Sequence, residues 1–136
     1  MVWSEKYETG NKQVDDEHKQ LFSLVQKVID QSFNTRIEKI ETAINFLAEY
    51  TVAHFKHEEE LMDESGYPGT VVHKKQHSDF LTEVVKMKDK ILREGDCLDN
   101  SLLINKTVSK WLTGHVIGSD LAMAAHYRQW SVEHKK

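Results

Sequence analysis

Residues 54–77, HFKHEEELMDESGYPGTVVHKKQH, contain the end of one helical pattern, a chain reversal and the start of a second helical pattern. Pro68 stands between Gly66 and Gly69, a combination that ends a helix and favours a turn. On both sides of this break the residues of the apolar stripe recur in steps of three and four, which is the spacing of one face of an α-helix. The stretch therefore predicts two antiparallel helices joined by a short connection.

The same periodicity continues through most of the chain and predicts helices at about residues 15–32, 35–64, 70–93, 99–117 and 120–130. Thr35 and Glu38 form a capping box at the start of the second helix. Sustained alternation of apolar and polar residues, the pattern of a strand, does not occur. We therefore expect an all-α fold, an antiparallel up-down-up-down four-helix bundle. Residues 1–14 would form an N-terminal arm on the outside, and a short C-terminal helix would follow Gly118 and Ser119.

The composition indicates one domain, because 136 residues, 39 % hydrophobic and 29 % charged, suffice for a single buried core. The formal net charge is −4 and the basic residues are scattered, which argues against nucleic-acid binding. No apolar run approaches the roughly 20 residues of a membrane span, and the first residues do not resemble a signal peptide. Cys97, the single cysteine, is interpreted as an incidental loop thiol of a protein in a reducing compartment. We expect a cytoplasmic monomer.

Polar residues occupy seam positions where the helical pattern calls for leucine or isoleucine. They are His18, His54, Glu58, His73, His77 and His115. A buried polar group without a partner costs of order 1–3 kcal/mol, so several in one layer need a strong common partner. Residues four apart on a helix lie on one face, and the bundle topology brings all these positions to the same end. The pattern predicts a metal centre, joined by Asp120 if Gly118 and Ser119 let the backbone bring that carboxylate back.

The donor set indicates two metal ions. Five histidines and two carboxylates exceed what one four-coordinate zinc ion takes, and they suit six-coordinate iron or manganese. Two octahedral ions have about twelve coordination positions, and bridging carboxylates plus a bridging oxo or hydroxo group leave about one open. The helices at 70–93 and 99–117 supply three histidines and the first two helices supply two. The vacancy, a binding site for a small ligand, therefore belongs to the ion with two histidines.

The remaining histidines are expected to have no role in this centre. His57 falls off the seam of its helix, and His134 lies in a charged, frayed tail, so both are predicted to be solvated. For His126 we likewise favour no functional role.

Several segments together resemble one known family over nearly the whole chain. They are VDDEH at 14–18, HFKHEE at 54–59, GYP at 66–68, HKKQH at 73–77 and WLTGH at 111–115, with Asp120. The chain is similar to the hemerythrins, in particular the single-domain bacterial ones. That resemblance implies a non-haem di-iron site that binds O2 reversibly. It assigns His73, His77 and His115 to a closed iron, His18 and His54 to an open iron, and Glu58, Asp120 and an oxo or hydroxo group to the bridges.

The resemblance also implies an apolar pocket at the open iron. Its lining would be formed by Leu21, Phe55, Trp111 and Leu112. Glu17 departs from the family pattern, since glutamine is more usual before the first histidine.

The expected function is reversible O2 binding for storage, delivery or scavenging. Two other classes stay open. A sensor would use the same site to report O2, redox state or NO to a protein partner. An oxidase, peroxidase or iron-handling protein would more often use carboxylate-rich ligation, so we expect no enzyme.

Overall fold

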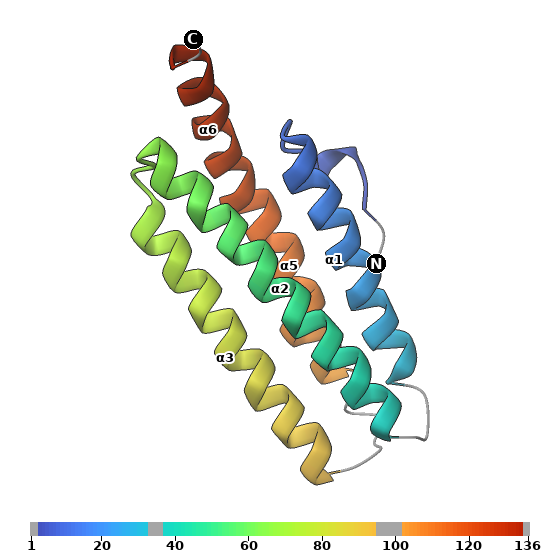
Figure 1. Cartoon of the computed structure of the whole chain (residues 1–136). Coiled ribbons are helices and arrows are strands. Elements are labelled where there is room, and N and C mark those ends of the chain that lie inside the picture. The colour runs from blue at the N-terminus through green and yellow to red at the C-terminus, as the bar shows by residue number, and fades with distance from the viewer. Residues whose placement is uncertain (1–2, 33–36, 95–101, 135–136) are drawn as a thin grey trace.

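The computed structural model describes residues 3–32, 37–94 and 102–134, and these residues form an antiparallel up-down-up-down bundle of helices (Figure 1). The first three long helices are α1 (Lys12–Gln31), α2 (Ile37–Ser65) and α3 (Thr70–Glu94). The chain then returns along the bundle through α5 (Lys110–His115) and α6 (Leu121–Glu133). The predicted all-α fold is confirmed. Thr35 of the predicted capping box and Cys97 lie outside the described residues.

Helix α1 begins three residues earlier than predicted. The backbone of Asn11 is extended, and its side-chain oxygen accepts a hydrogen bond from the backbone N–H of Val14 at 3.1 Å. An N-cap of this kind satisfies one of the free N–H groups at a helix start, so the helix begins at Lys12. The N-terminal arm is correspondingly shorter than the predicted 1–14.

The arm packs against α1 and is tied to α6. Tyr7 is buried, and its ring meets Phe22 edge to face at 4.8 Å between centroids. The Thr9 hydroxyl donates to Asp15 Oδ1 at 2.7 Å, and Arg128 Nη1 donates to the Thr9 carbonyl at 2.9 Å. Contacts between residues so far apart in the chain left no local signal in the sequence.

The connection between α2 and α3 is as short as the sequence predicts. Gly66 takes a left-handed conformation with φ +64° just after the last residue of α2, where glycine costs least. Helix α3 then starts at Thr70.

The last helical segment is continuous from 102 to 133. Two π-helical turns, η2 (Asn105–Ser109) and η3 (Val116–Asp120), widen it without interrupting it. The C-terminal helix α6 is therefore a continuation of α5. The structure replaces the loosening expected at Gly118 and Ser119 with a regular i→i+5 turn.

The core consists of apolar layers from all the long helices around one polar layer. Fully buried apolar side chains include Phe22, Ile40, Leu47, Ile91 and Val108. None of the helices in the described part of the chain is long and apolar enough to cross a membrane.

Candidate metal centre

Seven polar side chains from the long helices meet in the buried layer. Each is at most 6 % exposed to solvent: His18, His54, Glu58, His73, His77, His115 and Asp120. Their nitrogen and oxygen atoms form two groups in which all ligand atoms lie within 4.8 Å of one another. The structure thus brings together every residue predicted for the metal centre.

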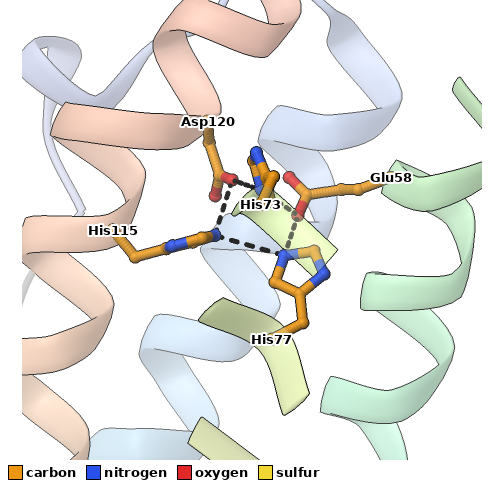
Figure 2. Close-up of side chains that lie close together, drawn as sticks. All are labelled: Glu58, His73, His77, His115 and Asp120. Atoms are coloured by element: carbon orange, nitrogen blue, oxygen red, sulfur yellow. Dashed lines mark hydrogen bonds and ion pairs between the residues drawn. The ribbon is translucent and has the colours of Figure 1, made fainter. Parts of the chain in front are cut away.

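The first group contains three histidines. Figure 2 shows His73, His77 and His115 pointing toward the carboxylates of Glu58 and Asp120. Asp120 Oδ1 lies 3.0 Å from Nε2 of both His73 and His115. Glu58 Oε1 lies 3.1 Å from His77 Nε2.

The second group contains two histidines and the same carboxylates. Asp120 Oδ2 lies 2.9 Å from His18 Nε2, and Glu58 Oε2 lies 3.4 Å from His54 Nε2. The histidines come from α1 and α2, whereas those of the first group come from α3 and α5.

Each carboxylate therefore presents its two oxygens to different groups. Oε1 of Glu58 and Oδ1 of Asp120 face the three-histidine group, while Oε2 and Oδ2 face the two-histidine group. This is the arrangement that a carboxylate needs to bridge two ions. The split into three and two histidines agrees with the sequence-based count.

Asp120 reaches this layer because of the π turn. Residues five apart on an α-helix differ by about 140° around the axis, which would point Asp120 away from His115. In η3 the Leu121 N–H donates to the Val116 carbonyl five residues back, so the turn is wider and Asp120 returns to the face of His115.

A second layer of carboxylates fixes two of the imidazoles. Glu17 Oε1 lies 2.6 Å from His54 Nδ1, and Glu59 Oε2 lies 3.0 Å from His77 Nδ1. A carboxylate accepts a hydrogen bond from the Nδ1–H group, which leaves the Nε2 lone pair of each ring directed at the centre. Glu59 was not among the predicted site residues, because its pairing with His77 depends on how α2 packs against α3. Its one local signal is that it follows Glu58.

The prediction that His57 is solvated is wrong. Its Nδ1 lies 3.0 Å from Glu17 Oε1, the same oxygen that contacts His54, and its side chain is 19 % exposed. The prediction failed because the partner comes from α1, across the helix interface. His134 is exposed as predicted, and His126 lies 3.0 Å from the Ser65 carbonyl, away from the seven-residue layer.

The metal-free layer holds strongly shifted pKa values. Burial lowers the pKa of His54, but the Glu58 charge and the Glu17 hydrogen bond outweigh burial and raise that pKa to about 10. Burial also lowers the pKa of His73, but the nearby Asp120 and Glu58 carboxylates outweigh burial and raise that pKa to about 9. Burial raises the pKa of Glu58 and Asp120, and the histidines around them outweigh it, so both pKa values are lowered. Without a metal, protons must compensate the carboxylate charge.

The residues present fit a pair of metal ions. Several buried nitrogen and oxygen atoms lie close together without hydrogen-bond geometry to any partner among the described residues, namely Nε2 of His18, His54 and His73, both Glu58 oxygens and Asp120 Oδ1. Nε2 of His77 lies 3.2 Å from Nε2 of His115. A neutral His77 that donates from Nδ1 to Glu59 carries no proton on Nε2, so this atom is free to bind a cation. Buried polar atoms without partners are costly, and cations would satisfy them together. Imidazole and carboxylate donors suit iron or manganese.

Aromatic rings cover the three-histidine group. Phe55 stacks on His77 at 3.7 Å between centroids, and Trp111 stacks on His115 at 4.3 Å. Leu21 and Leu112 are buried in the same core, one helical turn from His18 and His115 respectively. The contacts of Phe55 and Trp111 are thus with the histidines predicted for the closed ion, and their lining of a ligand pocket stays a prediction.

Comparisons with known proteins agree with this geometry. The family model described as hemerythrin HHE cation binding domain matches residues 9–134. A protein of Stenotrophomonas maltophilia named bacteriohemerythrin is 28 % identical, covering 99 % of this chain and 89 % of the relative. A bacteriohemerythrin of Clostridium acetobutylicum is 28 % identical over 88 % of this chain and 95 % of its own. A wild-type hemerythrin crystal structure matches with a TM-score of 0.82 at 25 % identity, over 93 % of this chain and 97 % of that one.

Proposed function

The chain belongs to the hemerythrin family, and on this premise we propose that it binds O2 reversibly at two non-haem iron ions. The observation that carries the proposal is the split of the Glu58 and Asp120 oxygens between the two histidine groups. Two ions bridged in this way have unequal numbers of histidine ligands. We assign His73, His77 and His115 to the closed ion, and His18 and His54 to the open one.

Reduced iron ions would supply the electrons and the coordination position that O2 requires. The protein residues hold and isolate the site. Glu17 and Glu59 keep the Nε2 lone pairs of His54 and His77 directed inward. The buried packing of Phe55, Leu21 and Leu112 keeps bulk water from the layer, which favours release of O2 unchanged over side reactions.

The ligand set favours binding over turnover. Five imidazoles and two carboxylates donate less negative charge than a carboxylate-rich di-iron site, which disfavours strongly oxidising iron states. We therefore propose an O2 carrier, store or scavenger.

The test is an optical spectrum of the iron-loaded, reduced protein over repeated exposure to air and argon. A visible charge-transfer band should appear with air and disappear when O2 is removed, over several cycles. Glu58→Gln, which keeps the shape but removes the bridging charge, is the control and should show no cycling band. Steady O2 consumption with irreversible bleaching would instead support an oxidase or peroxidase and contradict the proposal.

A further inference from the structure

The second layer around the centre is unequal on its two sides, and His57 makes the difference. Glu17 Oε1 contacts two imidazoles, with His54 Nδ1 at 2.6 Å and His57 Nδ1 at 3.0 Å. On the other side, Glu59 contacts His77 at 3.0 Å and, among the described residues, no further donor. On the two-histidine side the contacts thus run from His54 through Glu17 to His57. On the three-histidine side they run from His77 to Glu59 and, within the described part of the chain, end there.

Glu17 needs such an anchor because it stands at the surface of the bundle. It lines an open groove of about 580 Å³ between α1 and α2, together with Lys12, Asp16, Gln20 and Tyr50. Its side chain is 19 % exposed, whereas that of His54 is 1 % exposed. A glutamate at this boundary has room to rotate outward. The His57 N–H holds Oε1 on the inner side, against His54.

The contact distances fit this role for His57. Both Nδ1 atoms lie within 3.0 Å of the same carboxylate oxygen, so both imidazoles can donate to it. A charged acceptor makes each hydrogen bond about twice as strong as a neutral one. Because His57 and His54 are three apart on α2, one helix supplies both donors in a fixed relation.

We propose that His57 is a positioning residue for the open metal site: it holds Glu17 in place, and Glu17 in turn fixes the ring of His54. This inference rests on the proposed function, since it concerns the ion held by His18 and His54. That ion has fewer protein ligands than its neighbour, so the orientation of His54 matters most there. His57 itself contacts no metal and no O2.

The experiment compares release of iron to an excess of a ferrous chelator, followed as the loss of the first and of the second equivalent. His57→Phe keeps a planar ring but has no donor. It should release the first iron about tenfold faster, the lower end of the effect of losing a second-layer partner such as Glu17, and the second iron at the parental rate. His57→Asn, whose amide N–H stands near the position of Nδ1, should restore the first rate to within about twofold of the parent.

His126→Phe is the matched control, because His126 is a partly buried histidine that contacts the Ser65 carbonyl and not the centre. It should release both irons as the parent does. His57→Leu, also without a donor but smaller, repeats the test should the phenyl ring not fit. Release by the donor-free variants at the parental rate, equal acceleration of both irons, or failure of His57→Asn to rescue would overturn the proposal. A parent that holds two irons without binding O2 contradicts the proposed function, and the comparison of release rates still decides the role of His57.

Discussion

His115 Nε2 and Asp120 Oδ1 lie 3.0 Å apart although the two residues are five positions apart on one continuous helix. The π turn Val116–Asp120 produces this contact. No residue of this turn has a positive φ, and that includes Gly118. A methyl group at Gly118 would meet nothing within 4 Å. The contact depends on the hydrogen-bond pattern of the turn and not on the freedom of glycine.

Gly118→Ala should therefore keep the iron content of the parent. The free energy of unfolding should rise by about 0.5–1 kcal/mol, because alanine loses less backbone entropy in a helix. Urea titration of the metal-free protein and iron analysis of the loaded protein measure the two effects. Loss of iron in this variant would show that glycine is required for Asp120 to reach the centre.

The shared carboxylates predict how iron content responds to substitution. The parent should hold about two irons per chain. Glu58→Ala removes a ligand from both groups and should abolish most iron binding. His54→Ala removes a ligand from one group and should leave about one iron, held by the three-histidine group. Iron and zinc analysis after loading measures this. His126→Ala serves as the control, and a parent with one zinc ion per chain would contradict the two-iron assignment.

Leu112 is expected to exclude water from the open position. It is 5 % exposed and lies three residues before His115 on the same helical face. Leu112→Ala should bind iron normally and shorten the life of the oxygenated form at least tenfold, about 1.4 kcal/mol of barrier, because the cavity admits solvent. The decay of the visible band in air measures this lifetime.

Leu47→Ala is the matched control, since Leu47 is equally buried in α2 but two turns from His54. Both leucine variants should lose about 2–5 kcal/mol of stability, and only Leu112→Ala should oxidise faster. If the oxygenated form of Leu112→Ala lives as long as that of the parent, Leu112 does not cover the open position, and the pocket would instead be assigned to Phe55 and Trp111.

The raised histidine pKa values predict how the stability of the metal-free protein depends on pH. The pKa of His54 rises from 6.5 to about 10, and that of His73 from 6.5 to about 9. The folded state then holds these protons more tightly than the unfolded state. Their contribution to stability is fully present below pH 6.5 and is lost as the pH rises through 9 and 10. The free energy of unfolding should fall over this range.

Urea titrations at several pH values measure this dependence. The variant carrying both His54→Gln and His73→Gln should show a smaller fall than the parent, because tyrosine and lysine titration is common to both. An equal fall in parent and variant would show that these imidazoles do not store the protons.

The local pattern of the sequence was enough to predict the helices and most of the residues of the polar layer. The seam positions of His54, Glu58, His73 and His77 follow from spacing alone, because residues three and four apart share a helix face whatever packs against them. The short connection at Gly66 and Pro68 fixes α2 and α3 as antiparallel neighbours. The same reasoning predicted that all these residues meet at one level of the bundle.

What the sequence could not supply are contacts between helices and departures from regular helix geometry. The pairing of Glu17 with His57 and of Glu59 with His77 depends on the rotation and axial offset of packed helices. The residue spacing within one helix carries no information about either quantity. The position of the arm depends on Arg128, more than a hundred residues away from Thr9 in the chain. The sequence alone was enough to predict which polar side chains share the buried layer, because burial on one helix face is a local periodic property. Which carboxylate oxygen faces which histidine, and which neighbour holds each ring, became known only from the packed helices, because those distances depend on how separate helices pack.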